Sequence, residues 1–350
     1  MDSRPIHGRG ASHNPPNRFE TLSMERDGWS HEDDPAPRTQ VFRDRTRSII
    51  ATNRSPDVPL DAGVNPYRGC EHGCVYCFAR PNHEFLGFSA GLDFETKIVV
   101  KEDAARLLRE RLSSPRWKPQ PLMLSGVTDP YQPLERRLRV TRSVLAVLAE
   151  ARNPVAVVTK NHMVTRDVDL LSELAAWNAV SVTLSITTLR NDLQRVMEPR
   201  TSVPARRLDA VRTLAAAGVP VSVNVAPVIP GLTDHELPAI LEAAAAAGAT
   251  GAGWLMLRLP LGVSPLFQRW LGQHFPDRKE KVLNRLKELH GGRLYDPTFG
   301  TRARGEGPFA AQVKQMFQVA CRRAGLGTEA PELSVAAFRR PAPAGQCELF

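Results

Sequence analysis

Three of the five cysteines in this 350-residue chain lie within eight positions, as Cys70, Cys74 and Cys77, with the spacing C-x₃-C-x₂-C. Thiolates are soft ligands that suit iron–sulfur clusters, zinc and copper(I). Three thiolates on one short loop can bind three irons of a [4Fe–4S] cube and leave the fourth iron open for a second cofactor. Gly69 and Gly73 lie in the same stretch, and glycine allows the tight turns that aim the three sulfurs at one centre.

A structural zinc site is the alternative interpretation of this loop. Zinc normally takes four closed ligands, often in two separated pairs. The remaining cysteines, Cys321 and Cys347, lie more than two hundred residues downstream, so only His72 or His83 could complete a local set. The spacing therefore favours the cluster.

The composition is typical of a protein from a reducing compartment. Five cysteines with three in one cluster indicate metal binding rather than a disulfide framework. No apolar run approaches the length of about twenty residues that a membrane-spanning helix needs, and the N-terminus has no signal-peptide core. We therefore expect a cytoplasmic protein with no membrane partner.

Positive charge is concentrated toward the C-terminus. The net charge is +9, and residues 276–350 hold thirteen of the 46 Lys and Arg residues against eight of the 37 Asp and Glu residues. A basic region of this kind fits contacts to the phosphates of a nucleic acid. A solvated helical face is the alternative explanation.

Four regions are expected along the chain. Residues 1–54 are poor in aliphatic side chains and are predicted to be a disordered tail. Residues 55–262 are predicted to form the core, residues 263–326 a basic helical extension, and residues 327–350 a flexible tail rich in Ala, Pro and Glu.

Within the core, short hydrophobic strands alternate with helical segments about six times. Strands are expected at residues 62–66, 121–124, 155–159, 180–185, 219–226 and 252–257, with a further strand-like run at 96–100. Helices are expected at residues 102–112, 136–152, 167–176, 204–217, 233–248, 264–274, 277–290 and 310–325. This alternation indicates either a doubly wound parallel sheet or a βα barrel.

Polar residues stand at the ends of several expected strands. Thr128 and Asp129 follow the second strand, Lys160 follows the third, Ser185 ends the fourth, and Asn224 lies late in the fifth. The active sites of βα barrels gather at the carboxyl ends of the strands. An aspartate and a hydroxyl there could accept hydrogen bonds from an ammonium group, and a lysine could pair with a carboxylate. Taken singly, each residue is equally consistent with an ordinary turn or a surface charge.

The motif Cys70-x₃-Cys74-x-Tyr76-Cys77 resembles the signature of the radical S-adenosylmethionine (SAM) enzymes. The flanking stretches N-P-Y-R-G-C and C-F-A-R are most similar to the branch related to spore photoproduct lyase, often called DNA-repair-photolyase-like. The resemblance covers roughly residues 60–260. It implies an α/β fold with a partial (β/α)₆ barrel of the TIM type, to which the helical extension and the disordered N-terminal tail are added.

The resemblance also implies cofactors and partners. The three motif cysteines would ligate a [4Fe–4S] cluster, and a second set of residues would contact SAM. This second set is Tyr76, Thr128, Asp129, Lys160 and Ser185, with Asn224 added from its place in the fifth strand. In the family, an electron from the reduced cluster cleaves SAM and releases a 5′-deoxyadenosyl radical. A reductant such as a flavodoxin or a ferredoxin is therefore an expected partner.

Two positions depart from the pattern of spore photoproduct lyase. That enzyme has a hydrogen-donating cysteine in the loop after the second strand, and residues 125–129 contain none. It also has a tyrosine directly after the last cluster cysteine, where this chain has Phe78. The segment Glu198-Pro-Arg200 through Arg206-Arg207 resembles the branch too, although a helix entry with solvated arginines is an equal alternative.

The chain ends Gln346-Cys347-Glu348-Leu349-Phe350, which resembles the pentapeptide that binds the bacterial sliding clamp. A tail without function is the alternative. The leading hypothesis is a radical SAM enzyme that repairs or modifies nucleic acid, most readily DNA. The alternatives are a radical SAM enzyme acting on RNA, a peptide or a metabolite, and a non-catalytic metal-binding module that tethers DNA-processing partners.

Overall fold

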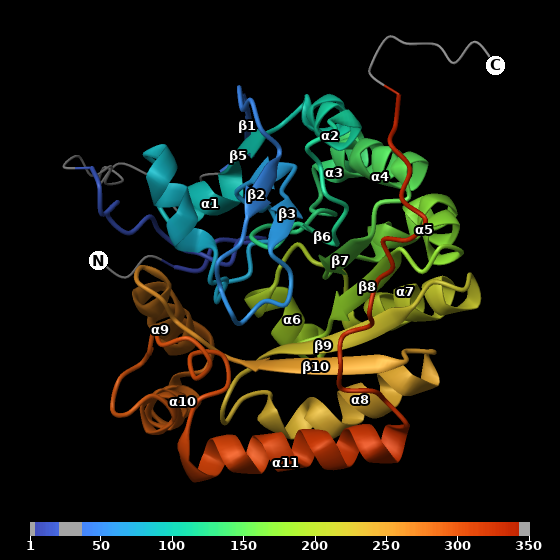
Figure 1. The fold of residues 1–350 in the computed structure, drawn as a ribbon. Coiled ribbons are helices and arrows are strands. Elements are labelled where there is room, and N and C mark those ends of the chain that lie inside the picture. The colour runs from blue at the N-terminus through green and yellow to red at the C-terminus, as the bar shows by residue number, and fades with distance from the viewer. Residues whose placement is uncertain (1–3, 21–36, 343–350) are drawn as a thin grey trace.

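The computed structural model describes residues 4–20 and 37–342, and its centre is a seven-stranded sheet in the order β10-β9-β8-β7-β6-β3-β2 (Figure 1). Six strands run parallel: β3 (Ala62–Val64), β6 (Leu122–Leu124), β7 (Val155–Thr159), β8 (Val180–Ser185), β9 (Val221–Val228) and β10 (Gly251–Met256). The sheet order ends at β10 on one side and at the antiparallel β2 (Ile50–Thr52) on the other, so the barrel is open. The predicted partial (β/α)₆ barrel is confirmed.

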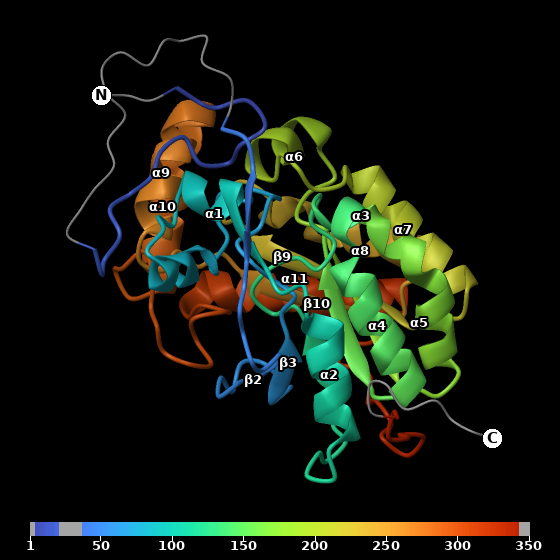
Figure 2. The ribbon, with the colours of Figure 1, turned by 90° about the horizontal axis from the view of Figure 1, so that it is seen from above.

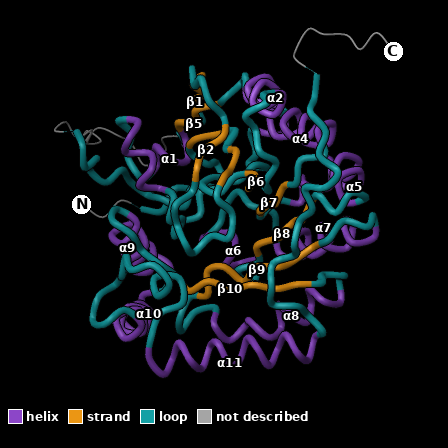
Figure 3. Tube along the Cα trace, in the orientation of Figure 1, coloured by secondary structure: helices purple, strands orange, loops and turns teal. Residues whose placement is uncertain are grey.

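Helices cover the outer face of this curved sheet, as the ring of helices around the strands shows in Figures 2 and 3. The crossover helices are α2 (Ala104–Ser113), α3 (Glu135–Leu138), α4 (Val140–Ala151), α5 (Val168–Ala175), α6 (Asn191–Met197), α7 (Pro204–Ala216) and α8 (Leu237–Ala246). Short 3₁₀ turns η1 (Arg80–Leu86), η2 (His162–Asp167) and η3 (Asp234–Glu236) and the short helix α1 (Leu92–Thr96) complete the connections.

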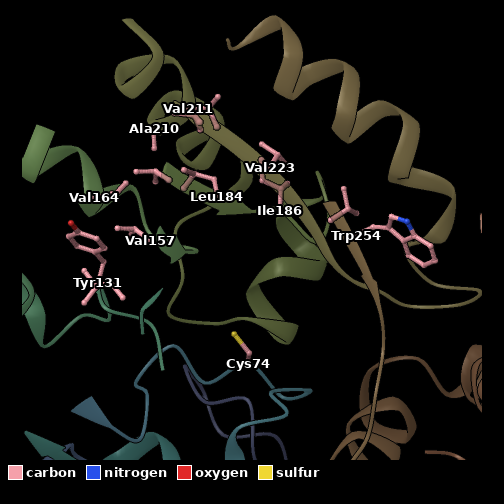
Figure 4. Close-up of a cluster of buried hydrophobic side chains, with 14 of the residues drawn as sticks. Cys74, Tyr131, Val157, Val164, Leu184, Ile186, Ala210, Val211, Val223 and Trp254 are labelled. Atoms are coloured by element: carbon pink, nitrogen blue, oxygen red, sulfur yellow. The ribbon is translucent and has the colours of Figure 1, made fainter. Parts of the chain in front are cut away.

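The core lies between the strands and these helices. Val157, Leu184 and Val223 come from three neighbouring strands, and they pack toward Val211 of α7 (Figure 4). Strands this rich in buried β-branched residues are typical of a parallel sheet covered on both faces. Cys74 stands at the margin of the same cluster, which places the cysteines directly against the core.

A second sheet of three strands, in the order β1-β5-β4, lies beside the cysteines. It consists of β1 (Gln40–Arg43), β4 (Tyr67–Arg68) and β5 (Lys97–Val100). The strand-like run at residues 96–100 is thus a strand, but it belongs to this small sheet and not to the barrel.

The predicted disorder of residues 1–54 is wrong for the part of this segment that the structure describes. Strands β1 and β2 pair with β5 and β3. Residues 4–20, called the N-terminal strap below, lie against α1 and η1. The backbone amides of Gly10 and Ala11 donate to the carboxylate of Glu95 at 3.1 and 2.8 Å. Low aliphatic content misled the prediction because the strap is held by polar contacts to the body and does not form a core of its own.

Asparagine side chains hold the rest of the strap. Asn14 exchanges hydrogen bonds with Asp93, accepting from its amide and donating to its carboxylate. Asn17 donates to the carbonyl oxygens of Glu84 and Phe88, both at 2.9 Å. These partners lie 67 to 79 positions downstream in the sequence.

The C-terminal region contains the three expected helices, α9 (Val263–His274), α10 (Pro276–Leu289) and α11 (Gly307–Ala324), with α11 packed beside α8 (Figure 1). The predicted flexibility of the final tail is wrong for residues 327–342, which run back across the outer helices. The amide of Ser334 donates to the carbonyl of Asn178 and that of Arg339 to the carbonyl of Ala151, both at 2.9 Å. Residues 346–350, with the proposed clamp motif, lie outside the described residues.

None of the helices in the described parts of the chain combines the length and apolar character that crossing a membrane requires.

Gly10 offers a test of the strap. A Cβ atom at this position would lie 1.7 Å from the carbonyl oxygen of Gly73, so Gly10→Ala must push the strap away from the cysteines. We expect faster hydrogen–deuterium exchange at the amides of residues 10 and 11, because their hydrogen bonds to Glu95 are lost. Ser12→Ala, which leaves the backbone contacts in place, is the control. Unchanged exchange in Gly10→Ala would show that the strap does not depend on this contact.

Candidate active site at the carboxyl ends of the strands

The cysteine loop, residues 69–77, begins just after β4 and turns tightly. Gly69 and Gly73 adopt left-handed backbone conformations, with φ of 78° and 66°. A Cβ atom on Gly73 would lie 2.8 Å from a carboxylate oxygen of Glu95, so the loop also packs too closely for a larger residue. The predicted role of both glycines in turning the loop is confirmed.

A buried arginine anchors the cysteine loop. The Arg80 side chain is fully buried; it donates to the carbonyl of Cys74 at 3.0 Å and to those of Ala90 and Gly91 at 3.1 and 2.9 Å. Its remaining nitrogen forms an ion pair with Glu95, which is also fully buried. Since Glu95 accepts the two strap amides as well, one carboxylate connects the loop, Arg80 and the strap.

The three thiols of the loop line one cavity of about 290 Å³. Cys70 and Cys74 are buried, and Cys77 is partly exposed. Burial raises the pKa of all three thiols, and the negative charge of Asp129 adds to the effect at Cys70. The free thiols are therefore protonated, and binding of a metal centre to them must release protons.

The two histidines that could complete a zinc site with the cysteines are engaged elsewhere. Both ring nitrogens of His72 have partners, Asp129 at 3.3 Å and Asn161 at 3.2 Å. His83 lies against Phe94, outside the residues that line the cavity. A zinc site normally needs a fourth ligand of this kind, whereas a cluster can take the three thiolates on three different irons.

The polar residues predicted from the strand ends meet the cysteines in this cavity. Its lining includes all nine residues expected to hold the cluster or the cofactor: Cys70, Cys74, Tyr76, Cys77, Thr128, Asp129, Lys160, Ser185 and Asn224. Residues up to 154 positions apart in the sequence are thus brought together at one edge of the sheet, as the parallel topology requires.

Asp129 is engaged by the protein itself. One carboxylate oxygen accepts from the amide of Tyr131 at 2.9 Å and the hydroxyl of Thr159 at 2.7 Å. The other accepts from the amide of Lys160 at 2.8 Å and faces His72. Burial would raise the pKa of Asp129, but His72 and these hydrogen bonds lower it overall. A carboxylate has about four acceptor sites, and these contacts hold that of Asp129 in one orientation at the cavity wall.

Lys160 belongs to a buried network around Glu198. Its ammonium group lies 3.3 Å from the Glu198 carboxylate and donates to the carbonyl of Ala226 at 3.0 Å. Tyr76 and Arg207 also donate to Glu198, whose side chain is fully buried. Burial would raise the pKa of Glu198, and the charges of Arg207 and Lys160 lower it strongly overall. A single carboxylate therefore balances two cations, Lys160 and Arg207.

Sequence reasoning missed Glu198 and Arg207 as parts of the site. Their segment was noted for its resemblance, with solvated arginines as the alternative, and that alternative is wrong for Arg207, which is 1% exposed. The alternative of a solvated arginine is correct for Arg206, whose side chain is exposed and pairs with Asp209. The sequence feature that could have pointed to Glu198 is its place directly before a proline near a helix start. Only the tertiary structure shows that its side chain is buried.

Asn224 differs from these residues because its side-chain oxygen is buried and has no hydrogen-bond partner in the described structure. It lines the cavity from β9. Buried polar atoms are nearly always satisfied, so this oxygen is an exception among the residues of the cavity wall. Thr128 is held in place, since its hydroxyl lies 2.7 Å from that of Ser125, a residue with a left-handed backbone of φ 66°.

The open βα barrel, with a three-cysteine cavity at its strand ends, defines a class of barrel enzymes that hold a metal cluster at this edge. A family model for the radical SAM superfamily matches residues 64–244, just over half of the chain, and the chain belongs to this superfamily. Its enzymes use a [4Fe–4S] cluster and SAM, which are therefore the cofactors of this chain. The three thiols and the orphan oxygen of Asn224 fit such a pair.

The chain is also similar to several proteins and solved structures. An uncharacterised protein of Mycobacterium tuberculosis is 38% identical over 252 residues, which cover 71% of this chain and 73% of the relative. An uncharacterised protein of Methanocaldococcus jannaschii is 28% identical over 49% of this chain and 62% of the relative. A spore photoproduct lyase variant with bound AdoMet and dinucleoside spore photoproduct has a similar fold, with a TM-score of 0.56 and 16% identity over 82% of this chain and 80% of that chain.

Replacing Glu198 by glutamine tests the buried network. Glu198→Gln leaves Lys160 and Arg207 without their buried counter-charge, and breaking such a pair costs about 3 kcal/mol or more. We expect a loss of this size in the free energy of unfolding, measured by urea denaturation. Glu242→Gln, at an exposed position of α8, is the charge-matched control and should change it by less than about 0.5 kcal/mol. A similarly small loss in Glu198→Gln would mean that the network does not hold the strand ends.

Proposed function

We propose that Cys70, Cys74 and Cys77 bind a [4Fe–4S] cluster and that this enzyme uses SAM to modify or repair a nucleic acid. The observation that supports the proposal best is the shared cavity, where the three thiols meet every strand-end residue predicted to contact the cofactor. When bound, cluster and cofactor together supply a one-electron cleavage of SAM into methionine and a 5′-deoxyadenosyl radical. A flavodoxin or ferredoxin of the cytoplasm is the proposed electron source.

Some residues of the cavity wall are proposed to contact SAM, and others to hold the wall in place. The unsatisfied oxygen of Asn224, together with Thr128 and Ser185, is proposed to contact SAM. Asp129 and Lys160 would act by fixing the two strand ends on which the cofactor rests, because both side chains are engaged within the protein. Tyr76 is held by Glu198 and would form part of the wall.

Three observations support a nucleic-acid substrate. The C-terminal region is basic, and Arg258 lies on the cavity wall. The fold resembles that of spore photoproduct lyase, an enzyme whose solved structures include one with a bound dinucleoside. RNA, a peptide or a metabolite remains the second candidate class, and a non-catalytic module the third. The motif at residues 346–350 would add a contact to the sliding clamp.

Cys74→Ala tests cluster binding. In anaerobically reconstituted protein we expect four irons per chain and dithionite-dependent formation of 5′-deoxyadenosine and methionine. Cys74→Ala should lose the iron and the product, because two thiolates hold the cube poorly. Cys321→Ala, at a buried cysteine of α11, is the matched control and should keep both. One zinc per chain and no nucleoside in the wild-type protein would leave only the metal-binding module.

The substrate class is tested by stimulation of SAM cleavage. We expect duplex or single-stranded DNA to increase the rate of 5′-deoxyadenosine formation. We also expect deuterium placed in the DNA to appear at the 5′ carbon of the 5′-deoxyadenosine that is formed. RNA of the same sequence and a basic peptide of equal length serve as comparisons. Stimulation by RNA or the peptide alone, or by none of the three, would contradict the choice of DNA.

A further inference from the structure

Arg258 lies at the end of the last parallel strand, where the amide of the preceding Leu257 donates to the carbonyl of Val228 at 3.0 Å. Its side chain lines the cavity and covers the ring of Phe78, with 4.0 Å between the guanidinium carbon and the ring centroid. Phe78 directly follows the cysteine loop, and 42% of its surface is exposed. Arg258 and Phe78 thus form one pair beside the three thiols.

Within residues 4–20 and 37–342, the guanidinium of Arg258 forms no hydrogen bond and no ion pair, although the charge of Asp57 acts on it from a longer distance. Other arginines in comparable positions do have partners. Arg302 pairs with Asp57 and donates to Ser55, and Arg304 donates to the carbonyl of Trp254. A partly buried guanidinium with five donors and no acceptor is costly unless a ligand supplies one.

The Asp57 carboxylate, whose charge acts on Arg258, is held by other groups. The Asp57 carboxylate accepts from Arg302 on one oxygen and from the amide of Gly300 at 2.7 Å on the other. Burial lowers the pKa of Arg258, and the positive charge of Arg302 lowers it further. Asp57 balances the charge of Arg302, so Arg258 contributes a positive charge with no carboxylate of its own at this side of the cavity, where it can attract an anion.

The surroundings of Arg258 suit a flat ring as well as an anion. Phe78 and Val127 both line the cavity and are both exposed, at 42% and 36%. An arginine stacked on an aromatic ring keeps its outer edge free for bidentate contact to phosphate. Combined aromatic and arginine surfaces bind nucleic acids by stacking bases and contacting the backbone.

We propose that Arg258, supported by the ring of Phe78, binds a backbone phosphate of the nucleic-acid substrate and so places the adjoining nucleotide over the cavity. The proposal rests on the nucleic-acid substrate proposed above and assigns it a specific contact. The carboxylate of SAM is a second anion of the same chemistry, and the experiment below separates the two.

The test is the salt dependence of binding by the anaerobically reconstituted full-length protein to a fluorescently labelled oligonucleotide, single-stranded or duplex. Loss of one phosphate contact reduces the slope of log K against log salt concentration by about 0.7 for single strands and about 0.9 for duplex. We expect this reduction, with about tenfold weaker binding, in Arg258→Gln. Arg258→Lys keeps the charge and should keep the slope while binding more weakly, since the planar fork is lost.

Arg111→Gln is the matched control. Arg111 lies outside the basic C-terminal region and outside the cavity wall; it is exposed in the last turn of α2 and also covers an aromatic ring, that of Trp117, with 5.6 Å to the ring centroid. The slope of log K against log salt concentration for this variant should equal that of the wild type. Circular dichroism and iron content of each variant establish that it is folded and loaded.

The outcomes are distinct. If the wild-type protein binds no oligonucleotide at moderate salt, the nucleic-acid substrate itself is wrong, and this contact with it. If the wild type binds and Arg258→Gln has an unchanged slope, only the assignment of Arg258 is wrong. A loss of affinity for SAM in Arg258→Gln, with the oligonucleotide slope intact, would assign the guanidinium to the cofactor's carboxylate and overturn the proposal.

Discussion

The buried ion pair between Arg80 and Glu95 fixes the cysteine loop to the rest of the protein. Arg80 holds the carbonyl of Cys74 and two carbonyls at the start of α1, while Glu95 holds Arg80 and the N-terminal strap. Two full charges inside a protein are stable only when all their hydrogen-bonding groups are satisfied. The position of the thiols therefore depends on a connected set of contacts that includes Arg80, Glu95 and the N-terminal strap.

The same principle explains how the strand ends are organised. Asp129 and Glu198 are both buried carboxylates, and both are saturated by donors from this chain. In our proposal they fix Lys160 and the neighbouring loops in one geometry, which a site for a reactive cofactor requires. Asn224 and Arg258 line the same cavity, and we propose that they face ligands because the Asn224 oxygen and the Arg258 guanidinium form no hydrogen bond within the described residues.

The sequence predicted the features that depend on local pattern. The cysteine motif, the six parallel strands and the residues at their ends all follow from spacing and from the rule that parallel strands end at a common edge. The strap and Glu198 depend on contacts across the chain: Gly10 meets Glu95 from 85 positions away, and Tyr76 meets Glu198 from 122 positions away. Polar segments of this kind appear disordered or solvated until the structure shows the carboxylates and carbonyls that satisfy them.

The composition of the cavity also restricts the chemistry that follows radical formation. Among the described residues that line it, the only thiols are those of Cys70, Cys74 and Cys77, and the loop after β6 presents Ser125 and Thr128 with their hydroxyls bonded to each other. A hydroxyl O–H bond is much stronger than a thiol S–H bond, so these groups do not replace a cysteine as a hydrogen-atom donor. Phe78 likewise has no transferable hydrogen where the lyase pattern has a tyrosine. The two groups that the lyase pattern uses to finish photoproduct repair are thus not found at these two positions. We propose that the Arg258–Phe78 pair at this edge of the cavity holds a substrate and does not transfer hydrogen.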